Sequence, residues 1–192
     1  MEQATGTDTA MLVLLVEGYK RAAASFSQMI SHPVRINGAN IRLTTDIIDF
    51  EKSLRSRDHK TIIQTKIIGE LSGDSYLMLT AEEIDVICNL SRKAFGGVSV
   101  PDELVLSEID NILSAAVITE ISNVLKIRIY GDVPRHLSTN DPNLKLHNIV
   151  GNKQDTTFLL VSNANFAFDD HHSICPYFLW LFDSRMNGLF DK

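Results

Sequence analysis

The sequence has few cysteines and no isolated cluster of positive charge. Its two cysteines, Cys88 and Cys175, are too few for the disulfide framework of a small secreted protein. Both lie in apolar runs, so we expect reduced thiols and a cytoplasmic protein. The net charge of the 192 residues is −6, and the densest basic stretch, residues 52–60, is flanked by acids. Nucleic-acid binding depends on clustered Lys and Arg and is therefore disfavoured.

Long apolar runs and the common ligand-binding motifs are also missing. The run MLVLLV at residues 11–16 is too short to span a bilayer, and the start before it lacks the positive region of a signal peptide, so we expect no membrane association. Gly96-Gly97 lacks the Lys and the spacing of a phosphate loop. The acids and histidines at residues 169–172 are adjacent and have no further ligand cluster in support, so we expect a solvated loop and no metal site.

Hydrophobic periodicity predicts a mixture of helices and strands. Helices are expected over residues 11–30, 81–95 and 101–125, and strands over 34–36, 41–45, 61–70, 75–80, 126–130, 144–150, 156–163 and 175–182. Residues 1–9 are expected to be loose, and residues 50–60 to form a loop or a short helix. Turns are expected at Asn37-Gly38 and at residues 71–74. Runs of strands with long helices on one face predict an α+β fold with an antiparallel sheet.

An aromatic run, PYFLWLF at residues 176–182, is a strongly apolar strand candidate. We expect it to form a core or interface strand. If it lay at an edge of the sheet it could pair with a second copy of the chain, so a homodimer is one possible arrangement.

The longest helix carries an unexpected pair of polar residues. In the stretch LSEIDNILSAAVITEISN at residues 106–123, apolar residues recur at helical spacing and mark a buried side. This stripe consists of Ile109, Ile112, Leu113, Ala116, Val117 and, just beyond, Val124. Glu108 and Asn111 stand three residues apart and neighbour each other on the helix surface. Ala115 and Thr119 follow on that face and leave room for a close approach. A plain solvated helix face is the alternative.

A faint internal repeat relates the two halves of the chain. When the sequence is shifted by 91 residues, Glu17 falls on Glu108 and Lys20 falls on Asn111. Each copy is a helix leading into a short basic and apolar strand. The repeat predicts pseudo-twofold symmetry in which only the second half carries the Glu–Asn pair. Chance similarity between two apolar helices is the alternative.

Three features around the longest helix form one pattern. Glu108 and Asn111 read E-x-x-N, Pro134 follows after twenty-two intervening residues, and the hairpin sequence GELSGDSYLML precedes the helix at residues 69–79. With this context, the chain resembles the CheC/CheX/FliY family of chemotaxis phosphatases. The family often has Asp or Ser four residues before the Glu, where this chain has Leu104. The resemblance implies a single CheC/CheX-like domain over residues 1–192, with pseudo-twofold symmetry and one active site, as in a CheX-like member.

By this resemblance, the protein would hydrolyse the aspartyl phosphate of a CheY-type response-regulator receiver domain. Such a reaction needs mainly positioning and charge stabilisation. Asn111 would position the attacking water, because its carboxamide donates and accepts hydrogen bonds without charge. Glu108 would contact the receiver lysine and orient the two proteins. The receiver would bring its own Mg²⁺, so this chain is expected to bind no cofactor.

Four further residues are candidates for contact with the partner. They are Ser107, Ala115, Thr119 and Pro134. Pro134 is equally well explained as a rigid turn at a strand end. Two other functions stay open: a non-enzymatic receiver-binding or flagellar-switch-like adaptor on the same fold, and an inactive copy that binds a receiver without hydrolysis. An adaptor has no chemical reason to keep the Glu–Asn pair.

Overall fold

Three helices and one eight-stranded antiparallel sheet make up the described part of the chain. In a computed structural model, residues 6–43, 58–137, 156–168, 172–183 and 185–186 are described. The helices are α1 (Gly6–Ile30), α3 (Ala81–Ala94) and α4 (Asp102–Leu125). The strands are β1 (Val34–Leu43), β2 (His59–Gly69), β3 (Gly73–Thr80), β4 (Ile129–Gly131), β5 (Arg135–Leu137), β6 (Thr156–Phe168), β7 (Ser173–Ile174) and β8 (Tyr177–Asp183). Their order is β1-β6-β8-β3-β2-β4, with β5 beside β2 and β7 beside β6.

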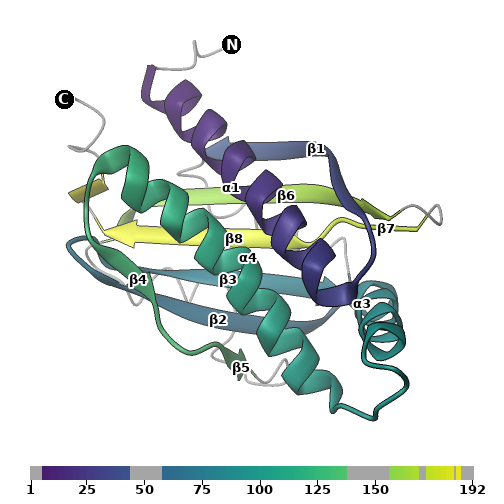
Figure 1. The fold of residues 1–192 in the computed structure, drawn as a ribbon. Coiled ribbons are helices and arrows are strands. Elements are labelled where there is room, and N and C mark those ends of the chain that lie inside the picture. The colour runs from purple at the N-terminus through teal and green to yellow at the C-terminus, as the bar shows by residue number, and fades with distance from the viewer. Residues whose placement is uncertain (1–5, 44–57, 138–155, 169–171, 184, 187–192) are drawn as a thin grey trace.

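The two long helices, α1 and α4, lie side by side across one face of the sheet (Figure 1). The main core lies between them and the sheet, where Tyr19, Leu113 and Trp180 are all buried. β8 runs through the centre of the sheet, and its residues 178–182 are almost inaccessible to solvent. The aromatic run is therefore a core strand, and it cannot serve as an edge that pairs across a dimer.

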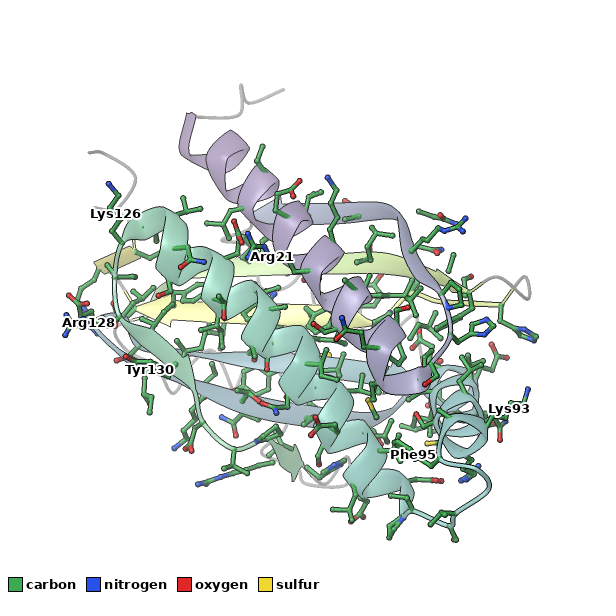
Figure 2. All side chains as sticks on the ribbon, viewed as in Figure 1. Arg21, Lys93, Phe95, Lys126, Arg128 and Tyr130 are labelled. Carbon is green, nitrogen blue, oxygen red and sulfur yellow. The ribbon has the colours of Figure 1, made fainter. Side chains whose placement is uncertain are left out.

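Close packing joins the two helices. Gly18 of α1 faces α4 so closely that a β-carbon at this position would lie 3.0 Å from both Cα and Cγ2 of Val117. Arg21 of α1 reaches the neighbouring helix, where it forms an ion pair with Glu120, with 2.9 Å between Arg21 Nε and Glu120 Oε2 (Figure 2). The position of α4 is therefore tied to that of α1 as well as to the sheet.

The predicted helices are confirmed, and local sequence explains where they begin and end. Thr80 starts α3 with a capping box, in which its hydroxyl accepts from Glu83 N and the Glu83 carboxylate accepts from Thr80 N. On α4, the predicted buried stripe is confirmed at Ile109, Leu113 and Val117. Val124, however, is 52% exposed, so the buried stripe ends one turn earlier than expected.

Several predicted boundaries are wrong. Residues 6–9 are helical, because α1 begins at Gly6, and residues 59–60 belong to β2. The expected turn at Asn37-Gly38 is a bulge within one ten-residue strand, β1, so residues 34–36 and 41–43 belong to one strand and not to two. The strand expected over 126–130 is confined to residues 129–131. The predictions for residues 1–5, 44–45, 50–57, 144–150 and 169–171 concern residues outside the described part of the chain.

The order of the strands is symmetric about the centre of the sheet. β8 and β3 pair in the middle, β6 and β2 flank them, and β1 and β4 lie at the two ends. Val34 begins β1 and pairs with Phe168 of β6, just as Ile129 begins β4 and pairs with Gly69 of β2. After three residues, each of these outer segments gains one extra residue relative to its neighbour. Each half therefore has a helix followed by an outer strand, offset by 95 residues, from Val34 to Ile129.

The ends of the two helices confirm this offset. The Ser27 hydroxyl donates to the carbonyl of His32 at 2.8 Å, and the Ser122 hydroxyl donates to the carbonyl of Ile127 at 2.6 Å. The residues that follow α1 and α4, Ser31 and Lys126, both have positive φ, 50° and 53°. Lys126 marks the end of α4 in Figure 2.

The predicted repeat is therefore real, but its offset of 91 residues is wrong by four. Four residues make about one helical turn, so the shifted alignment still matches buried with buried positions. With the correct offset, the counterpart of Glu108 is Val13 rather than Glu17. The counterpart of Asn111 is Val16 rather than Lys20.

Candidate active site

Glu108 and Asn111 are both exposed on the outer side of α4. Neither side chain makes a hydrogen bond or an ion pair with another described residue. Between and beyond them, Ile109 and Leu113 are fully buried and hold the helix on the sheet. A carboxylate and a carboxamide thus stand side by side on a fixed helix, with their hydrogen-bonding groups free to meet another molecule.

The other predicted residues of α4 fall into two groups. Ala115 and Thr119 are exposed and continue the face that carries Asn111. Ser107 is half-buried, and its Oγ lies 2.9 Å from His136 Nε2 of β5. The same nitrogen lies 3.0 Å from the carbonyl oxygen of Glu103, which can only accept, so Nε2 carries the proton in this arrangement. His136 therefore ties the first half of α4 to the outer strand.

Pro134 lies in the segment between β4 and β5 and is half-buried. At the start of this segment, a β-carbon on Gly131 would lie 3.3 Å from Ile118 Cδ1 of α4. At its end, His136 contacts Ser107. The segment that contains Pro134 therefore runs beside α4 from Ile118 to Ser107, and Asn111 lies between these two residues of the helix. Proline cannot donate to a strand ladder, and the outer strand is interrupted here, whereas its counterpart β1 is continuous. This supports the structural explanation of Pro134.

Asp110 lies on the opposite side of α4 from its two neighbours in the motif. It is fully buried, and Thr65 Oγ1 of β2 donates to its Oδ2 at 2.6 Å. Its second oxygen, Oδ1, is buried without a hydrogen-bond partner among the described residues. Burial raises the pKa of Asp110 to about 7, and the hydrogen bond from Thr65 acts in the opposite direction. This carboxyl group therefore changes charge near neutral pH.

Sequence reasoning missed Asp110, Thr65 and His136. A signal for Asp110 was present, because it lies four residues after Leu106 and three before Leu113, on the predicted buried side. An acid in that register is costly unless it is neutral or paired. The contacts made by Thr65 and His136 depend on which strands neighbour α4, and no local pattern carries that information.

The matching surface of the first half is chemically different. Val13, the counterpart of Glu108, is 56% exposed, and Val16, the counterpart of Asn111, is half-buried. One turn further on, Lys20 Nζ lies 2.6 Å from Glu17 Oε1. These two side chains neutralise each other on the surface. The first half therefore has no side chain that can form hydrogen bonds at the position that corresponds to Asn111.

The described residues hold no group of three or more His, Cys, Asp and Glu side chains that could bind a metal ion. Residues 169–171 of the acid–histidine run fall outside the described part of the chain. None of the helices described is both long and apolar enough to cross a bilayer. A groove of about 490 Å³ opens beside the first turn of α4, between α3, β2 and β5, and includes His136 in its wall.

Comparison with known proteins places this geometry in a fold family. No family model and no curated protein matches the sequence. Among solved structures, FliY of Thermotoga maritima is similar with a TM-score of 0.68 and 15% identity, over 100% of this chain and 97% of that one. CheX of Desulfovibrio desulfuricans is similar with a TM-score of 0.54 and 9% identity, over 89% and 99%. A structure of the FliG–FliM complex from H. pylori contains a chain with a TM-score of 0.57 and 10% identity, over 94% of both chains.

These likenesses first establish the class, an α+β fold with two long helices on a curled antiparallel sheet. They then identify it as the fold of FliY, CheX and CheC-like chemotaxis proteins, which the resemblance in the sequence predicted. FliM shares this fold. At these identities the likeness concerns the fold, and the chemistry has to be argued from the site itself.

Proposed function

We propose that the protein acts in chemotaxis signalling as a phosphatase for the aspartyl phosphate of a CheY-type receiver domain. The observation that carries the proposal is the free and exposed pair of Glu108 and Asn111 on a helix that packing holds in place. Together with the fold shared with CheX and FliY, this pair fits a site that enters a pocket on another protein.

The chemistry asked of this chain is small. Phosphoryl transfer needs an attacking oxygen in line with the leaving oxygen, and an acyl phosphate already has a good leaving group. The Asn111 carboxamide would hold one water so that its oxygen attacks phosphorus while the receiver's aspartate carboxylate leaves. Fixing that water removes part of the entropic barrier. Glu108 would pair with a lysine of the receiver, and the receiver's own Mg²⁺ would neutralise the phosphoryl oxygens.

One site per chain follows from the two halves. Val13 and Val16 stand where the second half has Glu108 and Asn111, and neither valine can hold a water or form an ion pair. This favours a CheX-like arrangement with a single site on α4. Ala115 and Thr119 would line the approach of the receiver, because their short side chains leave the helix accessible.

A second candidate function is a non-enzymatic adaptor of the flagellar-switch type. The similarity to a chain in a structure of a FliG–FliM complex favours it, because that structure contains two different proteins in complex. An adaptor needs a binding surface but no water-positioning amide. The fate of a phosphorylated receiver therefore separates the two functions.

The test compares two asparagines on the same helix. A CheY-type receiver phosphorylated with acetyl phosphate is followed by loss of phosphate with and without the protein. The unaltered chain should accelerate the decay, and Asn111→Ala should remove roughly 100-fold or more of the acceleration. Asn123→Ala, an exposed asparagine three turns further along α4, should change it less than twofold. Equal rates for the two variants would reject Asn111 as the water-positioning residue. Binding without any acceleration would favour the adaptor.

A further inference from the structure

The buried contact between Asp110 and Thr65 differs from its surroundings. α4 and β2 meet through an apolar core, yet at this point an acid and a hydroxyl form a 2.6 Å hydrogen bond with no access to solvent. Asp110 Oδ1 has no partner among the described residues. An unsatisfied buried oxygen is costly, so the contact is not explained by stability.

The first half of the protein shows that the fold does not need this polar contact. With the 95-residue offset, the counterpart of Asp110 on α1 is Leu15. β6 follows β2 with an offset of 99 residues, from Gly69 to Phe168, so the counterpart of Thr65 is Ala164. Leu15 and Ala164 are both buried in the apolar core. At these two positions the first half therefore has only apolar side chains.

Among the described residues, no charged side chain offsets the carboxylate form of Asp110. The charged side chains of the described elements that pack against α4 are exposed or have other partners. Arg21 pairs with Glu120, Lys20 with Glu17 and Arg92 with Asp102, and Glu83 accepts from the backbone N of Thr80 and of Cys175. His136 contacts Ser107 Oγ and the Glu103 carbonyl, and Lys66, Glu108 and Arg135 are exposed. Asp132, after β4, accepts from the backbone N of Val133. Ionisation of Asp110 therefore has to be compensated by entry of water or by movement of α4.

Close packing limits how such movement can occur. On the α1 side, Gly18 lies so near Val117 that a β-carbon would be only 3.0 Å from Val117 Cα. On the β4 side, a β-carbon at Gly131 would lie 3.2 Å from Thr65 Cγ2 and 3.3 Å from Ile118 Cδ1. α4 therefore has little freedom to slide sideways, and hydration of Asp110 would lift or rotate the turn of helix that holds it. The next residue in that turn is Asn111.

We propose that Asp110 is a positioning residue: its uncharged form holds α4 against β2 so that Asn111 faces the incoming phosphoryl group, and its ionisation displaces Asn111 and lowers activity. The effect on activity rests on the proposed function, whereas the coupling between the two residues does not. Asp110 itself touches neither the water nor the receiver. Its influence would therefore appear as a pH dependence that follows one titrating group.

The experiment has an activity readout and a structural readout, each from pH 5.5 to 8.5. Receiver decay is expressed as the ratio of accelerated to spontaneous rate at each pH, which removes the receiver's own pH dependence. The unaltered protein should lose about tenfold in this ratio between pH 6 and pH 8, as expected for one group that titrates near neutrality. Asp110→Asn, which keeps the size of the side chain without the titration, should stay within about twofold across the range. If Asp110→Asn lost about tenfold between pH 6 and pH 8, as the unaltered protein should, the proposal would be overturned.

The structural readout uses the side-chain amide signals of Asn111 in ¹H–¹⁵N NMR spectra, assigned by comparison with Asn111→Ala. They should shift with pH in the unaltered protein and stay constant in Asp110→Asn. Thr65→Val removes the hydroxyl donor and should move the midpoint of both profiles to higher pH, because that hydrogen bond favours the charged form. If the Asn111 amide signals depended on pH in the same way in the unaltered protein, Asp110→Asn and Thr65→Val, the coupling between Asp110 and Asn111 would be overturned. If no receiver decay is accelerated at any pH while the Asn111 signal still titrates, the proposed function fails and the coupling stands.

Discussion

The two halves of this protein share one backbone plan and differ in where they place polar groups. Both have a long helix, a serine that closes its last turn, a left-handed residue after it and an outer strand with one extra residue. In the first half, Val13 and Val16 occupy two positions on the outer side of α1, and Leu15 occupies a position on its buried side. In the second half, the same three positions hold Glu108, Asn111 and Asp110.

This difference separates what the fold requires from what the site requires. The closing serines recur because both helices must end at the same place relative to the sheet. The three polar residues of α4 occur in one half only, and the first half packs into the same core with apolar residues at these positions. The comparison therefore attributes the shared features to the fold, and it supports the proposal that the unshared residues serve function.

The largest expected effect comes from giving α4 the surface of α1. Glu108→Val combined with Asn111→Val should reduce receiver dephosphorylation to the spontaneous rate, a loss of roughly 100-fold or more, because no group remains to hold water. The free energy of unfolding should change by less than about 0.5 kcal/mol, since both positions are exposed. Phosphate release and urea unfolding measure the two quantities. Retained acceleration would contradict the assignment of the site to α4.

The next effect concerns the buried side of the same comparison. Asp110→Leu with Thr65→Ala gives the second half the apolar pair of the first. An acid whose pKa is higher in the folded state destabilises the fold as pH rises from about 4 to about 7, and the loss is constant above that range. The double variant should therefore gain about 3 kcal/mol more over the unaltered protein at pH 8 than at pH 5. Urea unfolding at the two pH values provides the measurement, and an equal gain at both would show that Asp110 does not titrate in this range.

A smaller effect is expected from the polar contact that the first half does contain. Tyr19 shares a hydrogen bond with Ser162 of β6 and accepts a weak one from Trp180 Nε1 at 3.4 Å. Tyr19→Phe should cost about 1 kcal/mol of unfolding free energy, the typical value for one hydrogen bond. Because tyrosine stays neutral between pH 5 and pH 8, this cost should not vary over that range. A cost that rises with pH would show that pH sensitivity is not confined to the second half.

Much of the fold could be read from the sequence, because element type follows from local periodicity. The three helices, the 71–74 turn and the antiparallel character of the sheet are all confirmed. The offset of the repeat was wrong because a helix looks nearly the same after each turn, so a slip of four residues leaves the buried face intact. The irregular positions fix the true offset: Ser31 and Lys126 at the helix ends, and the extra residue in each outer strand.

The site was only partly accessible from the sequence. Glu108 and Asn111 could be chosen because their spacing and exposure follow from one helix. The contact between Asp110 and Thr65 joins residues 45 positions apart, and it exists only once β2 lies beneath α4. The Asn37-Gly38 pair shows the opposite limit: its residues suit a turn, but pairing with β6 along the whole of β1 turned it into a bulge.

Because Gly18 has no side chain, α1 of the first half can pack closely against α4 of the second half and support it. Because no side chain separates the backbone of α1 at Gly18 from Val117, the first helix supports the second along the length that carries Asn111. In the proposed complex, a receiver that contacts Asn111 would therefore meet a helix held in place by α1 and by the sheet. The first half, which lacks the Glu–Asn pair, can thus still determine how rigidly α4 is held when the proposed partner binds.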